Sequence, residues 1–291
     1  MAELITAFVV GALAARLTWL AARPWFAQPA LLRPNYRGKQ LPTAAGLVFP
    51  LALFLVEGGR AVAGALGVGD EGITLARLLT LLAVSGFCVL GTIDDVAGSG
   101  EYRGFRGHVL ALAGGRVTTG LFKLLGGAAV ALVVVSPVSA GPGEGGVARL
   151  LADAALVALA ANLGNLFDRA PGRAIKGGLV AFGVLAVASG ADPALAGVAV
   201  LAGAAAGLLF DDLREDLMLG DSGANPLGAA LGLGVVLVAG PGVRNVTLAV
   251  LVVLNLLGEV VSFSRMIDAV APLRAFDRAG ASRERRQRPQ H

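Results

Sequence analysis

The chain has 291 residues, of which 56% are hydrophobic and only 15% are charged, and its mean hydropathy is +0.75. This composition excludes an ordinary soluble domain, because the apolar residues come in long runs instead of amphipathic stripes. One cysteine excludes an internal disulfide, and two histidines leave no room for a histidine-rich metal site. The net charge of +4 does not indicate nucleic-acid binding, since the basic residues lie in loops and a tail flanking the apolar runs.

Nine apolar runs of spanning or near-spanning length follow one another along the chain. They cover residues 3–22, 43–57, 74–93, 120–138, 147–166, 177–191, 194–210, 225–240 and 245–263. Glycine and alanine are abundant in these runs, which suits close packing of helices in lipid. We therefore predict an all-α, polytopic integral membrane protein with about nine transmembrane helices. Its transmembrane domain covers residues 1–272, and a basic tail over 273–291 is expected to be disordered.

The distribution of basic residues predicts the orientation. The first run has Glu3 at its start, and Arg16 and Arg23 come at its far end, which indicates a retained helix with its N-terminus outside. The loops then expected outside hold four basic residues: Arg60, Arg77, Arg149 and Arg244. The other 20 of the 24 lie inside, so the C-terminus is expected to be cytoplasmic and the protein to be a multi-pass protein of the cytoplasmic (inner) membrane.

Acidic residues mark the ends of the apolar runs. Five of them fall on the same predicted face, the cytoplasmic one: Asp94, Asp95, Asp168, Asp212 and Asp221. A carboxylate near hydrocarbon costs about 2.5–3.5 kcal/mol at a helix centre, so such residues are candidates for function. Converging acids at a membrane surface indicate a hard cation such as Mg²⁺ and, with it, a phosphate-bearing substrate.

The first acidic segment is the pair Asp94-Asp95, which ends the third run. Adjacent carboxylates repel each other, so both stay ionised only beside a cation or arginine side chains. The functional interpretation is a metal-binding or general-base pair next to basic residues that hold phosphate. The alternative is a helix end with two solvated acids.

The second segment places Asn162, Asn165 and Asp168 at a spacing of three, on one face of the fifth helix as it ends. A helix cap needs one such residue, not three. Three cations follow in the next turn and are plausible as a diphosphate clamp: Arg169, Arg173 and Lys176. A positively charged inside loop would account for these cations but not for the polar helix face.

The third segment contains Asp221 between Gly220 and Ser222-Gly223, just before the eighth run. Glycines on both sides allow a ligand to approach the backbone closely, although Asp221 could also be a simple helix cap. Three acids precede it, and at least one of them is expected to be merely solvated: Asp212, Glu215 and Asp216.

Taken in order, these segments resemble the polyprenyl-phosphate N-acetylhexosamine-1-phosphate transferase family, which includes the phospho-N-acetylmuramoyl-pentapeptide transferases. The family shows a Lys followed by a Thr-Pro-Thr-x-Gly-Gly-like segment, similar to Lys39 through Gly46. It also shows an Asp-Asp pair after a span, an Asn-Leu-x-Asp segment and a Met-Gly-Asp segment opening a span. These are similar to Asp94-Asp95, Asn165 to Asp168 and Gly220 to Gly223, so the resemblance covers about residues 35 to 265.

The resemblance implies a magnesium-dependent enzyme, with Mn²⁺ as a substitute, that uses a UDP-N-acetylhexosamine-type donor and polyprenyl (undecaprenyl) phosphate. In such enzymes the lipid phosphate attacks the sugar-linked phosphorus. The reaction releases UMP and forms a lipid-linked diphospho-sugar for cell-envelope glycan synthesis. A homodimer is also what the resemblance suggests.

Residue roles follow by position in the motifs. Asp221 would be the principal metal ligand, and Asp94 and Asp95 would act as further ligands and as base or phosphate-orienting groups. Lys39 and Lys123 would offset phosphate charge. The full set of expected substrate-binding residues is Lys39, Lys123, Asn162, Asn165, Asp168, Arg173 and Lys176. This division suits phosphoryl transfer, which needs charge neutralisation and in-line positioning.

The sequence departs from the family in several places, one of which is Ser222-Gly-Ala-Asn225 in place of the commoner Gly-Ser-Leu continuation. Asp168-Arg-Ala-Pro-Gly172 stands where an Asp-Gly-x-x-Gly turn is usual, and a His-rich loop and final span have no counterpart.

Two alternative functions remain open. One alternative is a CDP-alcohol phosphatidyltransferase, because the start of its motif is superficially similar to Asp168 through Arg173, but the two Asp residues of the second half of that motif are missing here. The other is a non-catalytic scaffold or a transporter, although acids at span ends favour chemistry at the interface over a mid-membrane transport site.

Overall fold

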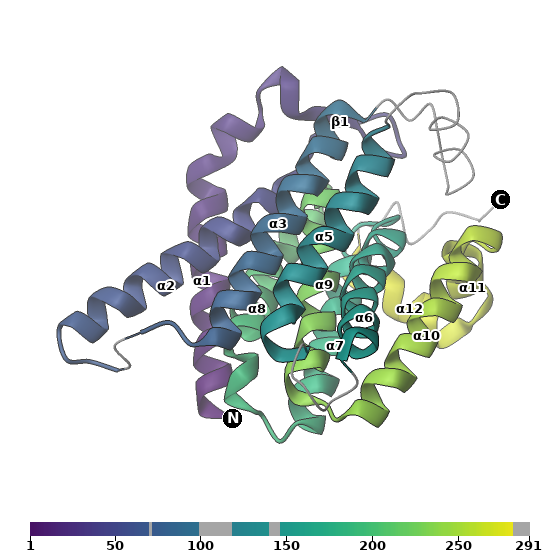
Figure 1. The fold of residues 1–291 in the computed structure, drawn as a ribbon. Coiled ribbons are helices and arrows are strands. Elements are labelled where there is room, and N and C mark those ends of the chain that lie inside the picture. The colour runs from purple at the N-terminus through teal and green to yellow at the C-terminus, as the bar shows by residue number, and fades with distance from the viewer. Residues whose placement is uncertain (70–71, 99–117, 140–145, 282–291) are drawn as a thin grey trace.

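The computed structural model describes residues 1–69, 72–98, 118–139 and 146–281, and within them the protein is an all-α, polytopic membrane protein (Figure 1). The basic residues predicted in the loop at 99–117 and those of the tail from 282 onward lie outside the described residues.

The long elements are α1 (Ala2–Phe26), α2 (Val48–Ala65), α3 (Leu75–Ala97), α5 (Thr119–Ser139), α6 (Gly146–Phe167), α7 (Arg173–Ala188), α8 (Ala196–Leu213), α9 (Asp221–Val238) and α10 (Pro241–Val260). Shorter ones are α11 (Phe263–Ala269), α12 (Ala271–Arg278), the 3₁₀ turns Pro29–Leu31, Ala45–Leu47 and Pro193–Leu195, and the strands β1 (Leu32–Pro34) and β2 (Gln40–Pro42).

Each of the nine predicted runs coincides with a helix. In the described part of the chain, eight of these helices are long and apolar enough to cross a membrane. The exception is α7, whose 16 residues are fewer than a full span needs. Large apolar side chains point outward along the bundle, for example Val184 and Val187 on α7 and Leu256 and Val260 on α10. Such a continuous apolar exterior is what lipid requires of a helical bundle.

Helix α9 lies in the middle of the bundle, between two groups of buried side chains. Leu227 belongs to the group built by α1, α2, α7 and α8, whereas Leu233 belongs to the group built by α3, α5, α6 and α10. Glycines make this close packing possible: a Cβ at Gly228 would overlap the main-chain oxygen of Ala160 on α6. The same small-residue contacts join α1 to α8, where Gly203 meets the backbone of Phe8.

A short antiparallel hairpin connects α1 to α2. Leu32 pairs with Pro42 and Pro34 with Gln40. The Oδ1 atom of Asn35 accepts hydrogen bonds from the amides of Arg37 at 2.8 Å and Lys39 at 3.0 Å, and so closes the turn. The hairpin lies at the end of the bundle where α3 ends and α9 begins (Figure 1).

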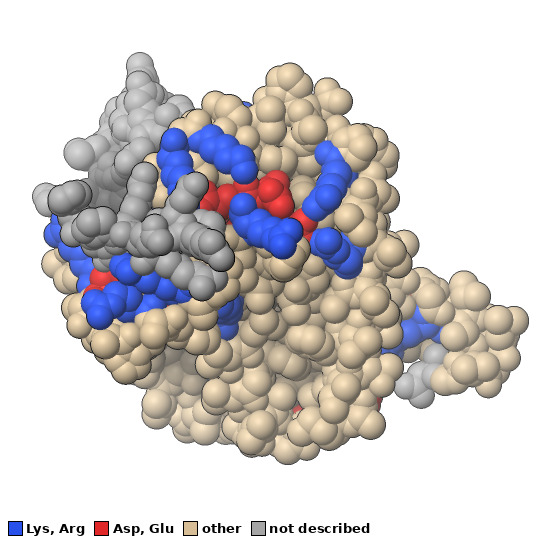
Figure 2. Space-filling view, turned by 180° about the vertical axis from the view of Figure 1, so that it is seen from behind, with Lys and Arg blue, Asp and Glu red and all other residues tan. Residues whose placement is uncertain are grey.

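Buried ion pairs fasten the helices at both ends of the bundle. At the hairpin end, the carboxylate of Asp211 on α8 accepts from Arg16, Arg23 and, at 3.1 Å, from the indole of Trp19, all on α1. The sequence pattern predicts only a topological role for these arginines and gives no sign of their partner Asp211. Figure 2 shows acidic side chains bordered by Lys and Arg toward this end of the molecule.

The opposite end has its own networks. Asp153 is fully buried on α6 and pairs with Arg149 and with Arg244, the latter at 3.1 Å, and it accepts the Ser139 hydroxyl at 2.7 Å. Glu57 on α2 pairs with Arg77 at the start of α3. These pairs satisfy charges that would otherwise be costly at membrane depth.

The expected boundary at residue 273 falls inside ordered structure. Helix α12 covers Ala271–Arg278, and Asp277 within it is buried. Arg173 at the start of α7 donates to both carboxylate oxygens of Asp277, at 2.7 and 3.0 Å, and Lys176 donates to the Asp277 main-chain oxygen at 2.6 Å. A basic composition predicted a free tail, but these cations of α7 hold residues 271–281 against the bundle.

Substitution Gly228→Ala is expected to lower the stability of the protein by about 1–3 kcal/mol, because the new Cβ would push α9 away from the backbone of α6. The matched control is Gly183→Ala, since a Cβ at that exposed α7 position meets no atom within 4 Å. Thermal unfolding of both variants in the same detergent measures the difference. Equal melting temperatures for the two variants would contradict this packing.

Candidate functional site

Three helices bring Asp94, Lys123 and Asp221 together at the hairpin end of the bundle. Asp94 lies in the last turn of α3, Lys123 in the second turn of α5, and Asp221 is the first residue of α9. The ammonium of Lys123 donates to the Asp94 carboxylate at 2.9 Å and also to the Asp221 carboxylate. Two carboxylates therefore share one cation in a partly exposed position.

Asp95 fixes the start of α9. Its two carboxylate oxygens accept hydrogen bonds from the amide of Asp221, at 2.9 Å, and from the amide of Ser222, at 3.0 Å. Amides in the first turn of a helix have no partner within the helix, and a carboxylate there also interacts favourably with the helix dipole. Asp95 thus holds Asp221 in place, while Asp94 next to it faces Lys123.

Glycines let these elements approach each other. Gly220 has φ +70° and ψ 177°, a conformation that is essentially limited to glycine, and a Cβ there would meet the Asp95 carboxylate. A Cβ at Gly91 on α3 would overlap the backbone of Asp221 and Ser222, and one at Gly46 would overlap Gly223. The backbones of α3 and α9 therefore touch at Asp221, the residue that the sequence shows between glycines.

Asp168 directly follows α6 and is half-buried beside the same group. Loss of surrounding water raises the pKa of Asp168 well above its ordinary 3.8. Three negative neighbours raise it further, namely Asp212, Asp221 and Asp95, and a hydrogen bond from the Gly220 amide acts in the opposite direction. Asp168 is thus held next to other acids, and within the described part of the chain no basic side chain forms an ion pair with it.

Asp212 has a supporting role in this arrangement. It is buried at the end of α8, and its Oδ2 atom accepts the amide of Gly172 at 2.8 Å. Gly172 has φ +72° and is the residue before α7, so this bond fixes the turn that follows Asp168. All five acids predicted on one face therefore lie at the same end of the bundle, at the ends or starts of α3, α6, α8 and α9.

Lys39 lies beside this group, in the hairpin. Its ammonium donates to the main-chain oxygen of Glu215 at 2.8 Å. The Glu215 carboxylate is buried and accepts from Asn35 at 2.9 Å and pairs with Arg37 at 2.9 Å. Glu215 thus anchors the hairpin to the α8–α9 connection. Asp216 next to it is exposed, as the sequence analysis expected of at least one of these acids.

Three of the remaining predicted binding residues, Arg173, Lys176 and Asn162, contact other helices. Arg173 and Lys176 are engaged by α12, as described above, and do not join the acid group. The amide of Asn162 donates to Asn255 on α10 at 2.7 Å, a contact between two helices at membrane depth. Asn165 is half-buried on α6, one turn before Asp168. The three polar residues of α6 therefore have different neighbours, because Asn162 contacts α10 whereas Asp168 lies beside the other acids.

The site offers a divalent cation only part of a coordination shell. In the described residues, no group of three or more His, Cys, Asp or Glu side chains is arranged to hold a metal ion. Asp94 and Asp221 nevertheless supply two hard oxygen donors that converge on one positive charge, that of Lys123. Mg²⁺ is typically bound by one or two carboxylates, with substrate phosphates and water completing its shell, so this donor set fits that ion.

Comparison with known proteins adds no identification, since neither a family model nor a curated protein sequence matches the chain.

Substitution Asp95→Ala is expected to destabilise the protein by about 0.5–2 kcal/mol, because the amides of Asp221 and Ser222 lose their acceptor. Asp95→Asn keeps one acceptor oxygen and should lose less. Hydrogen–deuterium exchange of the segment 219–227 should be faster than in wild type for Asp95→Asn and faster still for Asp95→Ala. Unchanged exchange in the alanine variant would show that Asp95 does not hold this helix start.

Substitution Asp168→Asn is expected to stabilise the ligand-free protein at pH 7. Because burial and neighbouring acids raise the pKa of Asp168 in the folded chain above its ordinary 3.8, this group lowers wild-type stability progressively as pH rises above that ordinary value, and asparagine does not. The difference in melting temperature between variant and wild type should therefore grow with pH and shrink toward pH 4. Thermal unfolding in detergent with EDTA measures it. A variant that melts below wild type at pH 7 would contradict the assignment.

Proposed function

We propose that the protein is a magnesium-dependent sugar-1-phosphate transferase that uses a UDP-N-acetylhexosamine-type donor and a polyprenyl phosphate acceptor. The observation that carries this proposal is the convergence of Asp94, Lys123 and Asp221 from three helices at one end of an apolar bundle. The order of the four sequence motifs supports the same class of enzyme. A site at the edge of the bundle suits a reaction between a lipid phosphate and a water-soluble nucleotide.

Charge is the main chemical requirement of the reaction. A lipid phosphate and a nucleotide diphosphate repel each other, and their reacting oxygens must be brought into line. Lys123 is the basic side chain at the centre of the acid group, so in this proposal it turns from the carboxylates to the phosphates as they enter. Bound Mg²⁺, held by Asp94 and Asp221, would neutralise phosphate charge and polarise the reacting phosphoryl group.

The atoms balance as a single phosphoryl transfer. An oxygen of the lipid phosphate forms a bond to the sugar-linked phosphorus, the bond from that phosphorus to the bridging oxygen breaks, and UMP leaves. Asp95 is a positioning residue in this scheme, because both its oxygens are engaged by the start of α9. Asp168, with Asn165 one turn before it, would face the nucleotide-sugar.

An apolar cavity supports the acceptor part of the proposal. It has a volume of about 330 Å³ and lies between α6, α7, α9 and α10. Phe167 lines it and immediately precedes Asp168, and Gly178, Leu227 and Gly232 line it farther along the helices. Every lining residue except Thr247 is apolar or glycine. Part of a polyprenyl chain would fit such a surface, with its phosphate near the acid group.

The orientation in the membrane belongs to the same proposal. The excess of basic residues in the predicted inside loops favours the cytoplasmic side of the cell membrane for the acid group. Nucleotide-sugars are cytoplasmic metabolites, so this orientation gives the site access to its donor. A role in cell-envelope glycan synthesis follows from the product, a lipid-linked diphospho-sugar.

The test is UMP release from a panel of UDP-sugars with undecaprenyl phosphate and Mg²⁺. Wild type should release UMP with at least one sugar. Asp94→Asn, Asp221→Asn and Lys123→Gln should each lose activity by about 100-fold or more, because each removes charge stabilisation at the reacting phosphates. EDTA should abolish the activity of wild type.

The matched control is Asp216→Asn, which removes an exposed carboxylate from the same connection and should leave UMP release unchanged. No UMP with any sugar would refute the enzymatic proposal. Activity that persists in Asp221→Asn would instead refute the metal assignment.

A further inference from the structure

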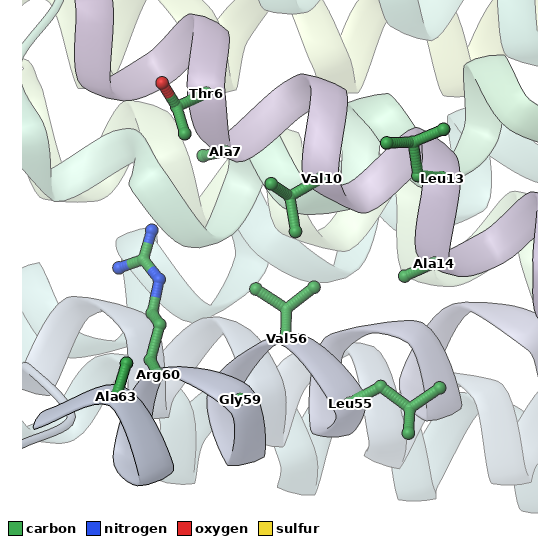
Figure 3. A pocket seen from close by; sticks show the side chains of 10 residues that line it. All are labelled: Thr6, Ala7, Val10, Leu13, Ala14, Leu55, Val56, Gly59, Arg60 and Ala63. Atoms are coloured by element: carbon green, nitrogen blue, oxygen red, sulfur yellow. The ribbon is translucent and has the colours of Figure 1, made fainter. Parts of the chain in front are cut away.

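A second cavity lies at the opposite end of the bundle, between α1 and α2. Helix α2 leans away from the bundle, which opens a gap of about 430 Å³ on the side of α1 (Figure 1). Val10 and Leu13 of α1 line it, together with Leu55 and Val56 of α2. Arg60 is the one charged side chain in its lining, and Figure 3 shows it extending from α2 into the gap on the side of Thr6.

Arg60 differs from the other arginines of that end. Arg77 pairs with Glu57, and both Arg149 and Arg244 pair with Asp153. Within the described part of the chain, Arg60 is only partly exposed and makes neither an ion pair nor a hydrogen bond. A guanidinium next to apolar side chains is costly without an anion, so this side chain is well placed to bind an anion from the surrounding lipid.

The position of Arg60 along α2 suits a lipid phosphate. It lies five residues before the end of the helix, which is about 7–8 Å along the axis. A long arginine side chain at this depth reaches the level of the headgroups while its stem stays in the apolar layer. The apolar residues farther along the gap, Val10, Leu13 and Val56, continue toward the membrane interior, where an acyl chain lies.

We infer that the gap between α1 and α2 binds one anionic glycerophospholipid, with its phosphate on Arg60 and an acyl chain along Val10, Leu13 and Val56. Among the described residues that line the cavity none is acidic, so none of them would hold the ammonium group of a zwitterionic headgroup. The site lies at the opposite end of the bundle from Asp94 and Asp221, so it is distinct from the proposed acceptor site. Such a lipid would fill the gap and support α2 against α1.

The test is native mass spectrometry of the purified protein in neutral detergent, titrated with phosphatidylglycerol or phosphatidylcholine of the same acyl chains. Wild type should retain one phosphatidylglycerol and bind it about tenfold more tightly than phosphatidylcholine. Arg60→Gln should remove this preference, and Arg60→Lys should keep much of it. Arg214→Gln is the matched control, because it removes an exposed arginine at the other end of the bundle.

A second variant keeps the inference falsifiable if Arg60→Gln does not fold. Val10→Trp leaves the arginine in place and fills the gap, so it should reduce retention of phosphatidylglycerol to a similar extent. Equal retention of both lipids by wild type would overturn the inference, as would unchanged retention in Arg60→Gln. A dimer mass that is lost in Val10→Trp would also overturn it, because a second copy of the chain would then occupy the gap.

Discussion

The two hydrogen bonds that the Asp95 carboxylate accepts from the first amides of α9 are the contact on which the candidate site depends. They join the end of one central helix to the start of another, at a point where glycines on both sides leave no room for a Cβ. Because α9 packs against both halves of the core, its start is held in a single position. Asp221 therefore reaches Lys123 and Asp94 with little freedom, which is the preorganisation that a charged reaction centre requires.

Charged groups in this bundle fall into two kinds. Asp211, Asp153 and Glu57 each have arginine partners and bury charge in balanced networks that join helices. The acids around Asp168 are different, since they repel one another and, among the residues that the structure describes, Lys123 is the cation that pairs with two of them. A folded protein keeps such repulsion only where the surrounding structure enforces it, and these places are commonly functional. This contrast favours the hairpin end of the bundle as the site of chemistry.

Much of the fold could be predicted from the sequence, because lipid imposes long apolar runs that are visible without knowing any contact. The same reasoning predicted that Asp94, Asp168 and Asp221 lie at one end. It could not assign partners to polar residues, since spacing fixes the face of a helix but not the neighbour that covers it. Asn162 thus meets Asn255 and Arg173 meets Asp277, and both depend on how α10 and α12 pack. A basic composition likewise gave no sign that residues 271–281 are ordered.

The contact of α12 with α7 has a consequence for how the molecule is made. Arg173 and Lys176 emerge from the ribosome about a hundred residues before the groups that neutralise them, Asp277 and the main-chain oxygens around it. Until synthesis passes Ala279, these contacts cannot form. Helix α7, too short to span by itself, therefore gains its contacts with α12 only after the other long helices of the described bundle have been made.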